Sequence, residues 1–116
     1  MALLDELKGL HVDVEQALSS LGGNSPLYEK LIFKLSAMIR DYEVTDGFED
    51  NDYQEIMEKA HALKGATGNL AVTPLYNGYS DIVRLLREER PKQAKEVIRT
   101  MLPVQEEIIR CIEKYR

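Results

Sequence analysis

Hydrophobic residues recur at spacings of three and four along most of the chain, which is the period of an α-helix with one buried face. The pattern is clearest over residues 27–42, and Ser25 and Pro26 indicate where that helix begins. A serine accepts hydrogen bonds from free backbone amides at a helix start, and a proline fits the first helical turn. The predicted core-facing stripe consists of Leu27, Leu31, Leu35, Met38 and Tyr42, with Ile32 and Ile39 beside it.

Two further long helices follow by the same reasoning. One covers residues 53–72, and we expect Asn51 or Asp52 to cap its start. The next covers residues 73–86 and repeats the start signal, because Thr73 is followed by a proline. Both segments keep the helical spacing of their apolar residues, so each is expected to bury one face.

The remaining segments complete the layout. Residues 90–115 predict the last long helix, with a kink or short break at Pro103, because an interior proline removes one backbone hydrogen bond. Residues 13–21 predict a short helix that stops at Gly22, and the acidic residues 43–52 predict a solvated loop.

Strand patterns are absent, so the chain is predicted to be all-α. Four long helices joined by short connections favour an antiparallel up-and-down four-helix bundle, with an additional short N-terminal helix. The length of 116 residues suits one domain, which we expect to span residues 1–116.

The composition of the chain disfavours several classes of partner and site. The net charge of -5 disfavours nucleic acid and anionic membranes as partners, because both would be repelled. The single cysteine, Cys111, offers no internal disulfide and no paired-cysteine metal site. Charged residues at Asp5, Glu6 and Lys8 interrupt any signal-peptide pattern, and no apolar run is long enough to span a membrane. These features favour a cytoplasmic protein that holds no metal or cofactor of its own.

Of the two histidines, His61 has the more informative neighbours, whereas His11 is expected to be an ordinary surface residue. The helical period places His61 away from the apolar stripe, with Gly65 and Gly68 on its own face. Each glycine costs a helix interior about 1 kcal/mol relative to alanine. Either the glycines let a neighbouring helix pack closely, or they clear space for a partner protein at His61. We favour the second alternative, and Lys64 would lie near any negative charge on the imidazole.

The run HALKGATGNLA at residues 61–71 resembles the phosphorylation motif of histidine-containing phosphotransfer (HPt) domains, which has His-x-Leu-Lys-Gly followed by small residues. Residues 12–18 and 21–24 are similar to the opening of such domains, and the resemblance covers about residues 9–113. Ala71 departs from the pattern, since a glycine commonly stands there.

The resemblance implies a phosphorelay intermediate of two-component signalling. His61 would accept a phosphoryl group from the aspartyl phosphate of one response-regulator receiver domain and pass it to the aspartate of another. Lys64 would help to neutralise the phosphoryl oxygens, and Gly65 and Gly68 would clear room for the partner. The Mg²⁺ ion would come from the receiver, and a hybrid sensor histidine kinase is an expected partner. The domain would have no kinase activity of its own and would be a monomer.

Partner docking is the least specific expectation. Met57, Tyr76 and Val83 are candidates for an apolar rim around the histidine. Relatives often carry a polar residue where this chain has Val83, and Arg84 or Arg87 is a candidate substitute. The alternative function is an interaction module that binds a receiver without being phosphorylated. A histidine kinase is disfavoured, because the sequence contains no nucleotide-binding signature.

Overall fold

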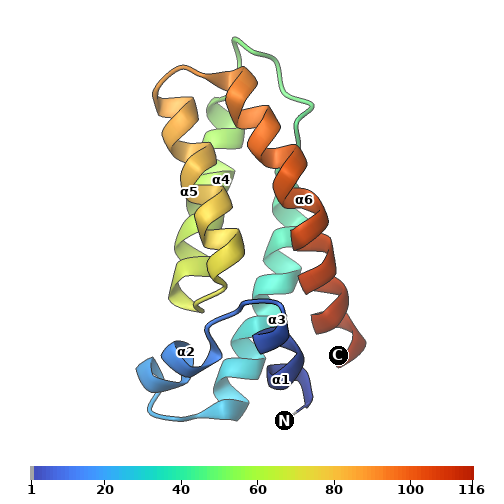
Figure 1. Cartoon of the computed structure of the whole chain (residues 1–116). Coiled ribbons are helices and arrows are strands. Elements are labelled where there is room, and N and C mark those ends of the chain that lie inside the picture. Colours follow the sequence, from blue (N-terminus) through green and yellow to red (C-terminus); the bar gives the residue numbers. More distant parts are fainter. Residues whose placement is uncertain (1) are drawn as a thin grey trace.

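The computed structural model describes residues 2–116 as six α-helices (Figure 1). In chain order they are α1 (Ala2–Gly9), α2 (Val14–Ser20), α3 (Ser25–Tyr42), α4 (Gln54–Asn69), α5 (Thr73–Arg87) and α6 (Pro91–Lys114). No β-strand occurs among these residues; Glu49 and Asp52 form only an isolated bridge. The all-α prediction is therefore confirmed over the described range.

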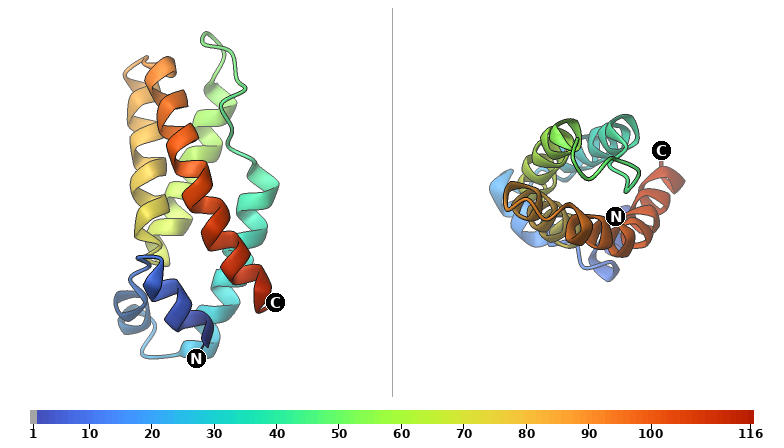
Figure 2. Two further views of the ribbon diagram at one scale, coloured as in Figure 1. Left: turned by 45° about the vertical axis from the view of Figure 1, so that its right-hand side comes forward. Right: turned by 90° about the horizontal axis from the view of Figure 1, so that it is seen from above.

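The four long helices form an elongated body with the short helices at one end (Figure 2). Helix α4 packs against α5 and α3, and α6 packs against α5 and α3. Helix α1 contacts α6, and α2 contacts α3. None of the six helices has the combination of length and apolar character that a bilayer-spanning segment needs, within residues 2–116.

The buried face of α3 is shifted by about one residue from the predicted stripe. Tyr28 is fully buried, whereas Leu27 is 38% exposed. The Tyr28 hydroxyl donates a hydrogen bond to the backbone oxygen of Leu70, at 2.8 Å. An amphipathic side chain can be buried when its polar end is satisfied in this way, which the spacing of apolar residues does not reveal.

The helix starts differ from the predicted caps. Asn24, not Ser25, caps α3, because its side-chain oxygen accepts a hydrogen bond from the Leu27 amide at 3.0 Å. Helices α4 and α5 begin after Tyr53 and Val72, and neither of these residues makes a side-chain capping bond. The three capping predictions were therefore wrong by one or two residues.

Helix α6 continues through Pro103, so the predicted short break does not occur. Pro103 is exposed, while Met101 and Gln105 on either side of it are buried. Burial of the opposite face holds the helix together across the missing backbone bond. The Tyr79 hydroxyl of α5 donates to the Gln105 side chain inside the core, which ties α5 to this part of α6.

The sequence reasoning also missed one helix. Helix α1 buries Leu3, Leu4 and Leu7, so two short N-terminal helices are present where one was predicted. Leu3, Leu4 and Leu7 have helical spacing in the sequence, but the prediction used only the charged residues beside them, which argue against a signal peptide.

The acidic loop between α3 and α4 is held against α6 by two ion pairs. Asp46 meets Arg99 at 2.7 Å, and Asp50 meets Lys95 at 2.6 Å. The hydrogen bond from Arg99 holds the pKa of Asp46 below its ordinary value, and Lys95 lowers the pKa of Asp50 in the same way. The loop is therefore anchored, rather than merely solvated as predicted.

Candidate functional site

His61 lies on the outer face of α4. Ala60, Leu63 and Thr67 are the buried residues of this helix, and their positions turn residue 61 toward solvent. The His61 side chain is exposed, as predicted from the helical period.

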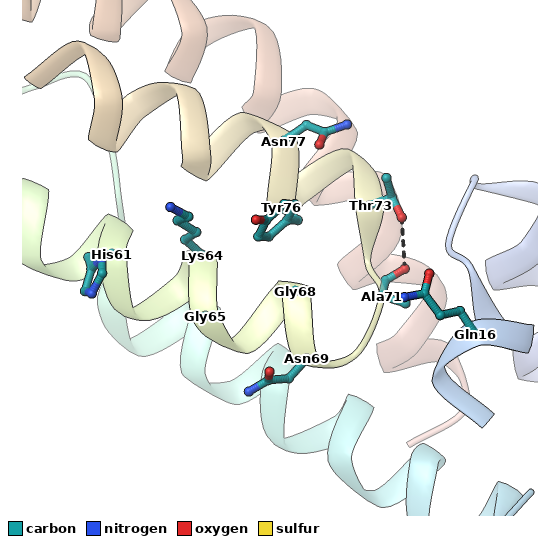
Figure 3. Close-up of a pocket in the computed structure, with 10 residues that line it drawn as sticks. All are labelled: Gln16, His61, Lys64, Gly65, Gly68, Asn69, Ala71, Thr73, Tyr76 and Asn77. Atoms are coloured by element: carbon teal, nitrogen blue, oxygen red, sulfur yellow. Dashed lines mark hydrogen bonds between the residues drawn. The ribbon is translucent and has the colours of Figure 1, made fainter. Parts of the chain in front are cut away.

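The ring lines an open hollow of about 630 Å³ (Figure 3). The hollow also contains Lys64, Gly65 and Gly68, so the structure brings together the four residues that the motif singled out. Its lining comes from three helices and the turn between α4 and α5. The remaining lining residues are Gln16, Asn69, Ala71, Thr73, Tyr76 and Asn77.

The electrostatic character of the hollow differs from that of the whole chain. The protein carries 20 acidic and 15 basic side chains, yet no carboxylate lines the hollow in the part of the chain that the structure describes. Lys64 is the only lysine or arginine there, and it makes no ion pair with any residue of the range 2–116. A site of this kind favours an anionic ligand.

The two glycines of α4 have different surroundings. A side chain at Gly65 would meet nothing within 4 Å, so the surface there is open. A Cβ atom at Gly68 would lie 2.8 Å from the nearest ring carbon of Tyr76. Close packing within the fold therefore accounts for Gly68, contrary to the preferred interpretation, whereas nothing in the fold requires a glycine at residue 65.

The C-terminal end of α4 is fixed by contacts from two other segments. Ala71 adopts a left-handed backbone with φ of 56°, and its carbonyl accepts a hydrogen bond from the Asp13 amide at 2.9 Å. The hydroxyl of Tyr28 holds the preceding carbonyl, and burial raises the pKa of this phenol to about 12. Glycine is the residue most often found in a left-handed conformation after a helix, which accounts for the glycine of the HPt pattern at this position. This chain has Ala71 there instead.

The predicted docking residues do not all reach the hollow. Tyr76 lines it and is 38% exposed. Val83 is 1% exposed and belongs to the core, so its predicted place on a docking rim was wrong. Arg84 lines a separate groove between α5 and α6 and pairs with Asp81 on its own helix and with Glu88 just after that helix. Met57 is partly buried against the core, and Arg87 is exposed without lining the hollow.

Sequence reasoning missed three carboxamide side chains in the hollow. Gln16 comes from α2, Asn69 from the end of α4 and Asn77 from α5. Asn69 belongs to the HPt-like run of residues 61–71, but no role was predicted for its carboxamide. No local signal connects Gln16 to His61, because only the packing of α2 brings them into one site.

His11 lies outside the hollow, in the exposed turn after α1. Among residues 2–116, no cluster of three or more His, Cys, Asp or Glu side chains is arranged to hold a metal ion. Comparisons with protein-family models, with curated proteins and with solved structures found no match.

Proposed function

We propose that this chain is an HPt-type phosphocarrier whose long helices form an antiparallel up-and-down four-helix bundle. His61 accepts a phosphoryl group from a receiver-domain aspartyl phosphate and passes it to the aspartate of another receiver. The observation that carries this proposal is an exposed histidine in a hollow that contains a lysine and, among residues 2–116, no carboxylate. The HPt-like run of residues 61–71 supports the same assignment.

The transfer requires little chemistry from this chain. A lone pair on a neutral imidazole nitrogen of His61 forms the N–P bond, and the bond between phosphorus and the aspartyl oxygen breaks. The aspartate leaves as a carboxylate, and the imidazole proton stays on the other ring nitrogen. Such transfers depend mainly on positioning and on neutralising the phosphoryl oxygens. The receiver supplies Mg²⁺ for this purpose, and Lys64 adds a positive charge from α4.

Gly65 contributes by having no side chain. It lies one helical turn after His61, about 6 Å along the axis. Since a Cβ atom there would touch nothing in the fold, the open surface is available to the receiver. The absence of a side chain lets the acceptor aspartate approach the imidazole closely.

The proposal includes the setting of the protein. The chain has no kinase activity of its own and relies on a hybrid sensor histidine kinase and on receivers as donors and acceptors. A cytoplasmic monomer suits a carrier that alternates between partners. These features follow from the HPt resemblance.

The deciding experiment incubates the chain with a panel of phosphorylated receiver domains and Mg²⁺, followed by intact-mass analysis. We expect one phosphoryl adduct that is labile in acid and stable in alkali, as expected for phosphohistidine. His61→Gln should remove it. His11→Gln is the matched control, because it removes the other histidine of the chain from an exposed site outside the hollow.

Each alternative result has a definite meaning. An adduct that persists in His61→Gln and disappears in His11→Gln would show that His11 accepts the phosphoryl group, and the assignment to His61 would be wrong. Receiver binding without any adduct would favour the non-phosphorylated interaction module.

A further inference from the structure

An open groove of about 500 Å³ follows residues 26–37 of α3 and continues to Arg116, just after α6. It lies at the end of the body where α3 begins and α6 ends (Figure 1). Lys30, Lys34 and Arg116 line it, and Glu29 is its only acidic side chain in the part of the chain that the structure describes. We call it the cationic groove. It shares no residue with the hollow on α4.

The cations of this groove differ from most others in the protein, because the fold gives them no ionic partner. Nine of the 15 lysine and arginine side chains form ion pairs within residues 2–116. Three of the other six line the cationic groove. Since the net charge of the protein is -5, composition alone does not account for this group. The six without an ion pair in that range are Lys30, Lys34, Lys64, Arg87, Lys92 and Arg116.

The two lysines of the groove carry a cost for the helix that holds them. Lys30 and Lys34 stand four residues apart on α3, or about 6 Å along its axis, and both are exposed. Like charges at this spacing destabilise a helix. Arg40 of the same helix shows the contrast, because two glutamates of α6 neutralise it. A negatively charged ligand that bridges the two lysines would remove their repulsion.

The groove also has apolar lining, and it is long. Phe33 is partly buried against the core, so part of its surface remains open to the groove. Pro26 and Ala37 are the first and last lining residues of α3. They are 11 residues apart in sequence, or about 16 Å along the helix, which about five residues of extended peptide would cover. A single small anion would cover only a fraction of this length.

The charge of the whole protein narrows the class of ligand. A nucleic acid or an anionic bilayer is a long array of negative charge and would meet the net charge of -5. A short acidic peptide meets mainly the charges within one screening length, about 8 Å at physiological ionic strength. Within that range the cationic groove is attractive to carboxylates.

We propose that the cationic groove binds an extended acidic segment of a partner protein, with its carboxylates on the three cations and an apolar side chain against Phe33. Because the groove and the hollow share no residue, this partner is bound apart from whatever protein meets His61. The proposal does not rest on the phosphocarrier function, since binding of the segment requires no phosphoryl transfer.

The test measures Kd by fluorescence anisotropy with a fluorescein-labelled peptide, Glu-Glu-Phe-Glu-Glu. Lys30→Gln with Lys34→Gln should raise Kd about fivefold to tenfold at low ionic strength, the loss expected for two exposed ion pairs. Added salt should weaken binding to the native chain. The double variant should be at least as stable as the native chain to urea, because it relieves a like-charge pair, so weaker binding does not come from unfolding.

Two controls separate a specific groove from general attraction between charges. Arg87→Gln with Lys92→Gln removes two other exposed cations without an ion pair, one from α5 and one from α6, and neither lines the groove. This variant has the same net charge as the groove variant and should keep the native Kd. The peptide Glu-Glu-Ser-Glu-Glu should bind the native chain severalfold more weakly, because it has no apolar side chain to contact Phe33.

Four results would each overturn the proposal. They are the absence of measurable binding to the native chain, a native Kd in the groove variant, an equal loss in the control variant, and equal affinity for the two peptides. A single-stranded oligonucleotide of equal charge is the remaining comparison. If it binds more tightly than Glu-Glu-Phe-Glu-Glu and loses affinity in the groove variant, the groove is a nucleic-acid site and the peptide assignment is wrong. Failure of phosphoryl transfer to His61 would leave all these outcomes unchanged, so the two proposals fail separately.

Discussion

The three glycines inside α4 and α5 make a graded test of the structure when each is replaced by alanine. At Gly65 the new methyl group would meet nothing within 4 Å. At Gly68 it would meet the ring of Tyr76, which is 38% exposed. At Gly78 it would lie 2.5 Å from the sulfur of Met101, which is 5% exposed and belongs to the core.

The expected magnitudes follow from two opposing contributions. Alanine stabilises a helix interior by about 0.8–1 kcal/mol relative to glycine. Gly65→Ala should gain this in full, which raises Tm by about 4 °C for a domain of this size. Gly68→Ala should change stability little, because displacement of the Tyr76 ring offsets the gain. Gly78→Ala should be less stable than Gly65→Ala by about 1–3 kcal/mol, the usual cost of overpacking a core.

Urea unfolding followed by circular dichroism gives the three free energies, with unchanged m-values as the check on two-state behaviour. Phosphotransfer from a receiver is measured on the same samples. We expect Gly65→Ala to be the most stable variant and the slowest in transfer, because its methyl group occupies the surface assigned to the partner. Gly78→Ala, in another helix, should transfer at the native rate while it remains folded.

Two results would refute the reasoning. If Gly65→Ala is destabilised, the conclusion that a side chain at residue 65 meets only open space is wrong. If Gly65→Ala is stabilised and transfers at the native rate, the geometry stands but the glycine has no part in docking.

Three further predictions concern stability. Tyr28→Phe should cost about 1–2 kcal/mol, seen as a lower urea midpoint, because the Leu70 carbonyl loses its buried partner. Burial raises the pKa of Tyr28 to about 12 and also raises that of Tyr79, so the folded state should lose stability as pH rises above about 10, where unfolded tyrosines ionise. Ultraviolet titration should show these two phenols ionising only as the helical signal is lost. Arg40→Gln should cost less than about 1 kcal/mol, since its two glutamate partners on α6 are exposed. Hydrogen bonding to Arg40 lowers the pKa of Glu106. The difference in free energy of unfolding between the native chain and Arg40→Gln should therefore vanish as pH falls through that lowered pKa, which acid unfolding curves would measure.

The sequence predicted the long helices well because their apolar residues keep one period over many turns. The capping residues of α3, α4 and α5 were each misplaced by one or two residues. At α3 two neighbouring polar side chains were equally suitable caps, whereas α4 and α5 begin after residues that make no side-chain capping bond. The position of Tyr28 was missed because its burial depends on a carbonyl at the far end of another helix, 42 residues later.

For the candidate site, the sequence determined its centre. The helical period placed His61 outside the apolar stripe, and Lys64 and Gly65 lie within one turn of it, so their shared surface is a local property of α4. Whether this surface accepts a phosphoryl group remains a proposal, supported by the motif and by the charge of the hollow.

Tertiary structure decided everything around that centre. It filled the space above Gly68 with the ring of Tyr76, buried Val83 and brought Gln16 into the hollow from α2. None of these outcomes has a local signature, because each depends on how one helix is rotated and seated against another. A period in the sequence fixes which face of a helix is buried, but the neighbour that covers the edges of that face is chosen only when all the helices pack together.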